Sequence, residues 1–380
     1  MKKVLMLFSM SFEPFQGRYL RAYNEARTLV ENGYQVTVLG WDRSGKSSPS
    51  EVKDGIRIER IFEKAPDRTG LKSLPNFSRF CGKVLYHLKD TRFDFVHCHN
   101  LQLLPLGLLL KGRWKIPLIF DSCEPDYFAL YPKKLQGAVK FLERFLANRA
   151  DAVFVHNDYQ VKKYTAFGHP RVMLIGSYPG KEMMRRGNGK PDAREKFTLG
   201  RIGSVYQDNG IEELVEGFRL ASKNIDNIEL LLAGRVFDSY KETFARTVNG
   251  LGNRVTVSGA FNSDEMPHLY DRIDVSVIIY HRSAWFKNIT PTKFFDSLAM
   301  GVPVIVSDMG GLREILERYR CGIVVDETNP REVADAITML YENPDLRHEM
   351  GLNGLRAIEE NYNWELMKER LLTVYRTLPE

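Results

Sequence analysis

The chain has 380 residues, with 54 Lys and Arg against 48 Asp and Glu, 43% hydrophobic residues and four cysteines. A single hydrophobic core stops growing at about 250–300 residues, so the length predicts two domains, and the ordinary composition excludes disordered and collagen-like chains. The cysteines form no CxxC pair, which argues against a zinc site or a disulfide scaffold and favours reduced thiols in the cytoplasm.

Short β-rich runs alternate with helix-period segments along most of the chain, a rhythm typical of parallel sheets covered on both faces. The fold class is therefore α/β. The predicted strands of the first half are Val4–Phe8, Gln35–Leu39, Ile56–Ile61, Phe93–His97, Pro117–Phe120, Ala152–His156 and Val172–Ile175. The apolar stretch Leu101–Leu110 is broken by Pro105 and is half of the roughly 20 residues that cross a bilayer, so no transmembrane segment is expected.

The same rhythm continues in the second half, after a segment rich in Gly, Pro and charge from Gly176 to Lys196 that we interpret as a linker. The predicted strands there are Phe197–Ile202, Ile228–Ala233, Arg254–Val257, Val275–Ile279, Val302–Val306 and Gly322–Val325. We therefore expect domains at residues 1–180 and 190–362. The last segment, 363–380, spaces apolar residues three or four apart, which predicts a helix that docks on the protein.

Charge is divided unevenly between the halves. Residues 1–180 hold 28 Lys and Arg against 17 Asp and Glu, and residues 181–380 hold 26 against 31. A basic half attracts phosphates or an anionic membrane surface, although scattered solubilising lysines would give the same count. Nucleic acid is not expected, because the chain lacks zinc-finger spacing, an RNP-like motif and a concentrated basic tract.

One segment of the basic half, Lys133–Ala150, has the pattern of a basic amphipathic helix. It places five apolar residues on one side and its lysines and arginines elsewhere; these apolar residues are Leu135, Val139, Leu142, Phe145 and Leu146. Such a helix can lie on an anionic membrane, or it can be a domain helix with a solvated face.

The segment from Asn288 to Gly311 carries the clearest chemical signal. Thr290 can cap a helix, Pro291 suits its first turn and Gly301 ends it. The start of such a helix attracts anions, and Lys293 adds a full charge, so a diphosphate would fit there. Asp296, on the same helix face, could accept hydrogen bonds from a ribose diol; the alternative is an ordinary surface Lys–Asp pair.

The order of these segments resembles the family-4 glycosyltransferases of the GT-B fold. The resemblance rests on the opening strand and Gly17, on DFVHCHN, IGSVYQDNGIEELVEGF and PTKFFDSLAMGVPVIVSDMGG, and on the terminal helix. It implies two Rossmann-like domains facing a cleft, with the terminal helix docked on the first. It further implies that the second domain binds a UDP- or GDP-sugar, and that the first binds a lipid-linked, polysaccharide or glycan acceptor.

The same resemblance implies transfer with retention of configuration and without a metal or other cofactor, by a cytoplasmic enzyme that could sit peripherally on the inner face of the plasma membrane. A GT-B protein that binds nucleotide sugar or a partner without transferring anything is the alternative. An epimerase on the same architecture is a third reading.

Several positions depart from the family pattern, in which two glutamates lie eight residues apart at this helix. Asn288 and Asp296 occupy those positions, so Asn288 keeps a hydrogen bond to the donor sugar and Asp296 takes the ribose. Relatives also place an Arg and a Lys on the diphosphate in the segment that begins at Gly203, where this chain has Ser204 and Asn209.

Two cations are available to compensate for the missing Arg and Lys. We expect Lys293 first and Arg201 second to take over the phosphate; the alternative for Arg201 is that it covers the edge of a strand.

The first domain offers a second set of polar candidates. The helix near Gly17, with Arg18 or Arg21, favours a phosphate. Ligands bind beyond the carboxyl ends of parallel strands, so the polar residues there should line the cleft. These residues are His97, His99, Asp121, Cys123, Glu124 and Asp126. Cys123 stands where relatives carry a histidine at the transferring sugar, so Glu124 or His99 is expected to take over its role, unless the histidine is merely structural.

Overall fold

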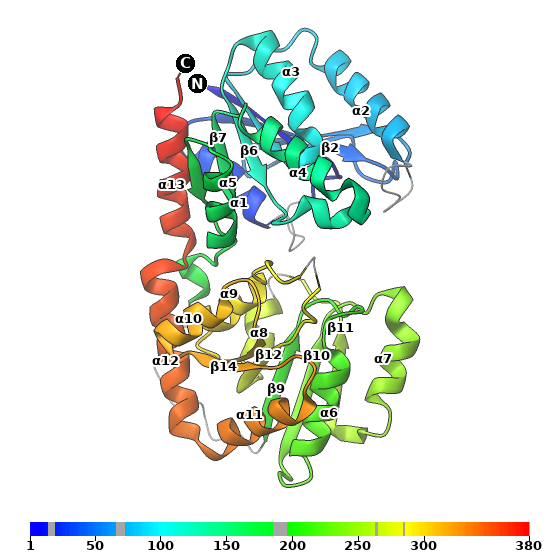
Figure 1. The fold of residues 1–380 in the computed structure, drawn as a ribbon, viewed down its shortest axis with the longest axis vertical. Coiled ribbons are helices and arrows are strands. Elements are labelled where there is room, and N and C mark those ends of the chain that lie inside the picture. The colour runs from blue at the N-terminus through cyan, green and yellow to red at the C-terminus, as the bar shows by residue number, and fades with distance from the viewer. Residues whose placement is uncertain (14–19, 66–72, 185–195, 263–264, 284–285, 380) are drawn as a thin grey trace. The chain divides into compact units, whose positions relative to one another are not determined.

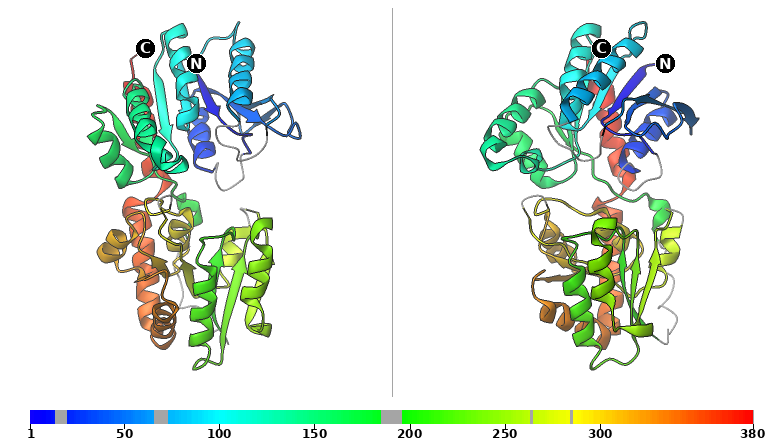
Figure 2. Two further views of the ribbon diagram at one scale, coloured as in Figure 1. Left: turned by 45° about the vertical axis from the view of Figure 1, so that its right-hand side comes forward. Right: turned by 90° about the vertical axis from the view of Figure 1, so that its right-hand side faces the viewer.

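The structure is a computed structural model that describes residues 1–13, 20–65, 73–184, 196–262, 265–283 and 286–379. The chain divides into two compact units: Met1–Ser177 with Met367–Glu380, and Tyr178–Leu366 (Figure 1). Each unit contains one sheet with helices on both faces (Figure 2). Part of the predicted linker, residues 185–195, and Gly17 lie outside the described residues.

The first unit is built on an eight-stranded sheet in the order β3-β4-β2-β1-β5-β6-β7-β8. Its strands are β1 Lys3–Phe8, β2 Gln35–Asp42, β3 Ser50–Lys53, β4 Ile56–Phe62, β5 Phe95–His99, β6 Leu118–Ser122, β7 Ala152–Val155 and β8 Val172–Leu174. Its helices are α1 Leu20–Glu31, α2 Leu74–His87, α3 Leu104–Trp114, α4 Lys133–Ala147 and α5 Asp158–Ala166, with 3-10 turns η3 Leu101–Leu103 and η4 Tyr127–Leu130.

The seven strands predicted for this half are all present, but the edge strand β3 was missed. It pairs antiparallel with β4, whereas the other neighbours in the sheet are parallel. The two strands are joined by Asp54 and Gly55, both at positive φ (49° and 77°). Asp-Gly between two β-rich runs is a strong hairpin signal, so the sequence did contain this strand.

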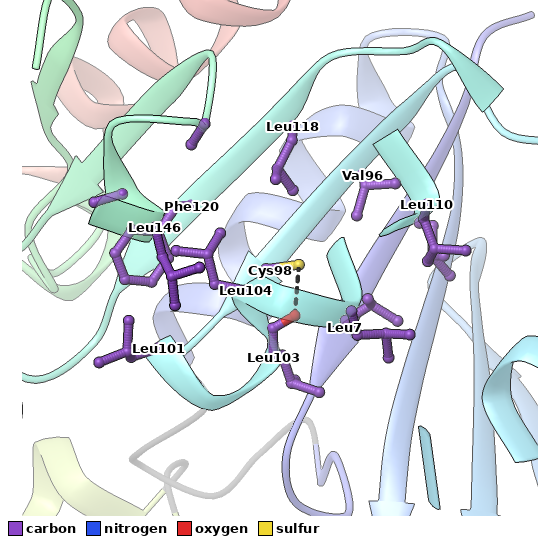
Figure 3. Close-up of a cluster of buried hydrophobic side chains, with 14 of the residues drawn as sticks. Leu7, Val96, Cys98, Leu101, Leu103, Leu104, Leu110, Leu118, Phe120 and Leu146 are labelled. Atoms are coloured by element: carbon purple, nitrogen blue, oxygen red, sulfur yellow. Dashed lines mark hydrogen bonds between the residues drawn. The ribbon is translucent and has the colours of Figure 1, made fainter. Parts of the chain in front are cut away.

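Successive side chains of β5 point to opposite faces of the sheet and so contribute to two different parts of the core of the first unit. Val96 and Cys98 point into an apolar cluster formed with α2 and α3 (Figure 3), and Cys98 donates from Sγ to the Leu103 carbonyl at 3.7 Å. A Cβ at Gly107 of α3 would lie 2.3 Å from that Sγ, so glycine allows the helix to pack directly on the strand. The intervening residues Phe95, His97 and His99 therefore face the opposite side of the sheet.

The last helix, α13 Trp364–Thr377, covers that opposite side. It starts in the second unit, and its residues from Met367 onward belong to the first. Tyr375 is buried, packs against the Phe95 ring at 5.1 Å and hydrogen-bonds His97 Nδ1 at 3.0 Å. The terminal helix thus docks on the N-terminal sheet, as the fold class predicted.

The second unit has a six-stranded, wholly parallel sheet in the order β11-β10-β9-β12-β13-β14. Its strands are β9 Phe197–Ile202, β10 Ile228–Ala233, β11 Val255–Gly259, β12 Val275–Ile278, β13 Val304–Ser307 and β14 Gly322–Val325. Its helices are α6 Ile211–Ala221, α7 Lys241–Val248, α8 Met266–Tyr270, α9 Thr292–Ala299, α10 Leu312–Tyr319, α11 Pro330–Glu342 and α12 Pro344–Asn361, with 3-10 turns η5 Lys181–Met183, η6 Asp238–Tyr240 and η7 Gly252–Arg254.

The predicted fold class, two parallel-sheet α/β domains, is confirmed. Among the described residues, no helix combines the length and the apolar character that a membrane span requires.

Candidate functional site

A group of cations lies at the carboxyl-terminal end of the sheet in the second unit. Arg201 belongs to β9, Tyr280 follows β12, and Lys293 lies in the first turn of α9. The Arg201 guanidinium lies 5.2 Å from the centre of the Tyr280 ring, and Lys293 Nζ lies 5.3 Å from the same point. One aromatic ring therefore holds two cations at the edge of the sheet where ligands of parallel sheets bind.

Arg201 is buried, and the Tyr280 ring is the contact that the structure records for its guanidinium among the described residues. Its side chain is 0% exposed, and Nε, Nη1 and Nη2 have no hydrogen-bond partner among the described residues. β9 is an inner strand of the sheet, so the alternative that Arg201 covers a strand edge is wrong. A buried charge is costly unless it is paired, so the geometry provides for an anion at this position.

Glycine at the end of β9 makes room for the lysine. Gly203 has φ +120°, and a Cβ there would lie 2.8 Å from Lys293 Nζ. Gly234, at the end of β10 with φ +145°, would place a Cβ 2.2 Å from the Gly203 carbonyl oxygen. The structure thus brings together Arg201, Gly203 and Lys293, three of the predicted donor-binding residues, and Gly234 allows the close backbone approach.

Burial perturbs the titration of the whole group. Burial and the Arg201 charge lower the pKa of Lys293 to about 8. Burial alone would raise the pKa of Tyr280, but Lys293 and Arg201 outweigh it and lower the pKa to about 8. Burial raises the pKa of Asp296 to about 7, against the pull of Lys293. Mutual repulsion between two cations would be relieved by a bound anion.

The start of α9 differs from the predicted cap. The N-cap is Pro291, with no side-chain capping hydrogen bond, and Thr290 Oγ1 instead donates to the Gly310 carbonyl at 2.7 Å. Thr290 as the helix cap is therefore wrong. Ser297 Oγ donates to the Lys293 carbonyl at 2.7 Å and lies 2.9 Å from Ser276 Oγ, which ties the first turn of α9 to β12.

The remaining donor candidates lie in the segment between β9 and α6 and in the turn before α9. Ser204 is exposed, and Asn288 is half-buried in the turn before α9. Asn209 is buried; its Oδ1 accepts the Tyr206 backbone N–H at 2.8 Å, while its Nδ2 has no partner among the described residues. Burial and the neighbouring Tyr280 raise the pKa of Tyr206 to about 12. The rings of Tyr206 and Tyr280 both pack against Phe286, at 6.2 and 5.4 Å, so the Asn209 loop lies beside the cationic group.

The first unit contains a buried network of charged side chains. Arg21 of α1 pairs with Glu25 one turn later at 2.8 Å and donates from Nη2 to both oxygens of Asp121, at the end of β6. His99 lies between the carboxylates, with Nδ1 3.3 Å from Asp121 and Nε2 3.8 Å from Glu25. His97 Nε2 is 3.8 Å from Asp121.

This network corrects the expectation that the polar strand ends line an opening. His97, His99, Asp121 and Asp126 are each at most 1% exposed, and Asp126 accepts the Tyr159 hydroxyl at 2.8 Å. Arg21 was expected to favour a phosphate, but it is buried against two carboxylates.

Two of the predicted acceptor-side residues, Cys123 and Glu124, remain half-buried. Burial and the Asp121 charge raise the pKa of Cys123 well above its usual value, so this side chain remains a thiol. Its Sγ lies 3.6 Å from Asp121 Oδ1 and 4.0 Å from His99 Nδ1. Burial also raises the pKa of Glu124 to about 7 and lowers the pKa of His99 well below its usual value. Near neutral pH, Glu124 can therefore be either protonated or ionised.

The network also contains potential metal ligands. Atoms of Glu25, His97, His99 and Asp121 lie within 4.8 Å of one another. Burial opposes ionisation of Asp121, yet Arg21 outweighs it and holds the pKa of Asp121 well below its usual range. Because Arg21 already contacts both carboxylates, it supplies the positive charge that a metal would bring.

Sequence reasoning missed three functional neighbours: Glu25, Gly234 and Tyr280. The i, i+4 spacing of Arg21 and Glu25 was a usable signal for a paired helix face. No local pattern distinguishes Tyr280 or Gly234, because their importance depends on what two other strands bring beside them.

Two parallel-sheet α/β units, one of them with a cationic group at its strand ends, match the two-domain GT-B architecture. Residues 17–176 match the family described as Glycosyl transferase 4-like domain, and residues 182–356 match Glycosyl transferases group 1. The chain belongs to these family-4-like glycosyltransferases and is a sugar-transferring enzyme.

Its relatives support this assignment. The chain is 26% identical to spore coat protein SA of Bacillus subtilis, over 95% of both chains. It is 23% identical to D-inositol 3-phosphate glycosyltransferase of Corynebacterium diphtheriae, over 92% of this chain and 87% of that protein. Among solved structures, it is similar in fold to sucrose-phosphate synthase from Thermosynechococcus elongatus (TM-score 0.79, 19% identity, 99% and 98% coverage). It is also similar to Anabaena HepE in complex with UDP (TM-score 0.75, 16% identity, 99% and 100% coverage).

Proposed function

We propose that the enzyme uses a UDP- or GDP-sugar and that Arg201 and Lys293 bind its diphosphate. The observation that carries the proposal is the buried Arg201 guanidinium, with three nitrogens that lack a partner among the described residues. Uncapped N–H groups at the start of α9 would add partial positive charge on the same side. The UDP complex of HepE, a protein of similar fold, supports a nucleotide ligand.

The other donor residues take their roles from their positions around this group. Asp296, one turn into α9, would accept hydrogen bonds from the ribose, and Asn288 would contact a hydroxyl of the donor sugar. Gly203, Ser204, Asn209 and Thr290 would form the loops against the phosphates. Gly17, in the first unit, is assigned to the donor from the resemblance alone.

The proposed chemistry needs no metal or other cofactor. The bond between the anomeric carbon and the diphosphate oxygen breaks, and the negative charge that develops on the leaving group is met by two fixed cations and the helix end. The acceptor oxygen bonds to the same face of the sugar, and its proton passes to the departing phosphate, so configuration is retained.

The acceptor would bind to the first unit near Cys123, Glu124 and His99. We propose a lipid-linked sugar, a polysaccharide or another glycan as acceptor, at the inner face of the plasma membrane. Glu124, whose pKa lies near neutrality, would accept a hydrogen bond from the reacting hydroxyl, while Cys123 and His99 shape its surroundings. The Cys123 thiol is too weak a donor and base to replace an imidazole.

Calorimetric titration with UDP and GDP tests the donor site. Lys293→Met should weaken binding of the cognate nucleotide by at least about tenfold, because a charge-assisted hydrogen bond is worth about 1.5–3 kcal/mol. The matched control is Lys287→Met, since Lys287 is an exposed cation six residues earlier. Equal affinity of Lys293→Met and the unmodified enzyme would refute the site.

Transfer assays with the common nucleotide sugars test the reaction itself. The expected result is release of UDP or GDP coupled to glycosylation of an acceptor, slowed in Lys293→Met and Asp296→Ala. Tight nucleotide binding without turnover on any acceptor would instead support a non-catalytic binding protein. A product epimerised without an acceptor would support the epimerase reading.

A further inference from the structure

Helix α4 buries one acidic side chain and leaves several large apolar side chains exposed. Its buried residues are Glu143, Leu146 and Ala147. Its exposed apolar residues are Phe141 (69% exposed), Leu142 (49%), Phe145 (44%) and Leu135 (41%). The apolar residues predicted for one side of this helix do share a side, but Leu146 is the one among them that the structure buries, whereas Leu135, Leu142 and Phe145 are exposed.

The buried Glu143 explains this orientation. Its Oε1 accepts from Lys163 Nζ at 2.7 Å and from the Tyr164 hydroxyl at 2.6 Å, both on α5. A buried carboxylate is tolerated only when paired, so these contacts hold α4 with the glutamate inward. Residues about half a helical turn away, including Phe141 and Phe145, must then point outward.

The outward face carries charge of one sign. Glu143 is the only acidic residue of α4, so its exposed charges are all basic; they are Lys133, Lys134, Lys140 and Arg144, with Arg149 just beyond the helix end. Phe141 and Phe145 stack with ring centres 6.3 Å apart, and Arg149 lies 3.4 Å from the centre of the Phe145 ring. We define these exposed apolar and basic residues of α4, together with Arg149, as the outer α4 face.

We propose that the outer α4 face binds the surface of an anionic lipid bilayer. Large exposed apolar side chains on a helix whose exposed charges are all basic match an interface where the apolar groups enter the acyl boundary and the basic groups meet lipid phosphates. Long basic side chains can extend to the headgroups while their stems lie on apolar surface. A partner protein would need an apolar groove bordered by acidic side chains, whereas an anionic bilayer presents acyl chains below negatively charged headgroups over its whole surface.

The position of α4 connects this surface to catalysis, a link that rests on the proposed function. The segment from the end of β6 to α4 carries Cys123 and Glu124, the candidate acceptor residues. Lys163 Nζ donates both to Glu143 and to the Pro125 carbonyl at 2.7 Å, so one ammonium joins α4 to the loop that follows Glu124. Contact of the outer α4 face with a bilayer would therefore hold the acceptor loop near lipid-anchored sugars.

Sedimentation with vesicles tests the surface, using phosphatidylcholine alone or mixed with phosphatidylglycerol. The full-length protein should bind the mixed vesicles at low salt, and binding should weaken at high salt and with phosphatidylcholine alone. The double variant Phe141→Ser/Phe145→Ser should bind at least about tenfold more weakly. The control Met339→Ser/Leu352→Ser removes two similarly exposed apolar residues of the second unit and should bind like the unmodified protein.

The outcomes separate this inference from the proposed function. Failure of the unmodified protein to bind anionic vesicles at low salt overturns the inference, as does equal loss in both double variants. Concentration-dependent self-association that disappears in Phe141→Ser/Phe145→Ser, without vesicle binding, overturns it in favour of a second copy. Transfer to a soluble acceptor by the Phe141→Ser/Phe145→Ser variant shows that its fold and the proposed chemistry are intact, whichever way vesicle binding turns out.

Discussion

Replacing Arg201 by Met should stabilise the protein while weakening nucleotide binding. In the absence of ligand, the guanidinium is 0% exposed and its three nitrogens lack partners among the described residues. Removing a buried charged group that has no hydrogen-bond partner among the described residues should relieve about 1–3 kcal/mol, and methionine fills most of the same volume and can still pack on the Tyr280 ring. For a unit of this size, that stabilisation corresponds to an increase in melting temperature of about 2–10 °C.

The same substitution should cost affinity for the nucleoside diphosphate. Loss of a charge-assisted contact of about 1.5–3 kcal/mol weakens binding by about 10- to 150-fold. Thermal unfolding without nucleotide and calorimetric titration with UDP and GDP measure the two effects on the same preparations.

Arg60→Met is the matched control for Arg201→Met. Arg60 is also buried, but its guanidinium donates to the Phe12 and Ser48 carbonyls and pairs with Glu51. Its replacement should lower the melting temperature and leave nucleotide affinity unchanged. A lower melting temperature for Arg201→Met with unaltered UDP and GDP binding would show that Arg201 is a structural residue, and the reasoning would be refuted.

Three further predictions concern charge and backbone. Because the pKa values of Lys293 and of the neighbouring Tyr280 are both about 8, the affinity of the cognate nucleotide should fall as pH rises above 8, by at least about tenfold at pH 9, and the fall should be smaller in Lys293→Met, which keeps only the titration of Tyr280. Arg21→Met should lower the free energy of unfolding, measured with denaturant, by about 3–5 kcal/mol, because it leaves two buried carboxylates uncompensated. Arg27→Met removes one member of an exposed i, i+4 pair on the same helix and should lower it by less than about 0.5 kcal/mol. Gly234→Ala should destabilise by at least about 2 kcal/mol through its φ of +145° and the 2.2 Å approach of the new Cβ to the Gly203 carbonyl oxygen. Gly112→Ala, at an exposed position of α3 where a Cβ meets open space, should instead stabilise by about 0.5–1 kcal/mol.

The helix at the end of the chain shows how far periodicity carries a prediction. Apolar residues three or four apart in 363–380 predicted a docking helix, and the structure buries Met367, Leu371 and Tyr375 of α13. The same rule failed at α4. There, Glu143 interrupts the apolar stripe, and its pairing with Lys163 decided which side faces inward. A hydrophobic pattern cannot anticipate a buried ion pair whose other member lies 20 residues away.

Only part of the candidate donor site could be predicted from the sequence. Lys293 and Asp296 could be proposed because a helix start marked by Thr290 and Pro291 is a local signal. That Arg201 lies buried beside Tyr280, with no hydrogen bond to any of the described residues, could not be proposed with equal force, because it depends on β9 and β12 being neighbours in the sheet. In the first unit, polar strand ends were correctly recognised as a group, but their burial against Arg21 followed from how α1 packs.

Local chemistry by itself determined the elements of this protein: continuous apolar runs gave the inner strands, Gly and Pro marked their ends, and the ordered motifs indicated the family. Only the tertiary structure decided which polar groups are paired, which lack a hydrogen-bond partner and which are exposed. The physical reason is that hydrogen bonding and desolvation depend on every neighbour within a few ångströms, and most of those neighbours, such as Tyr280 for Arg201 and Lys163 for Glu143, come from distant parts of the chain.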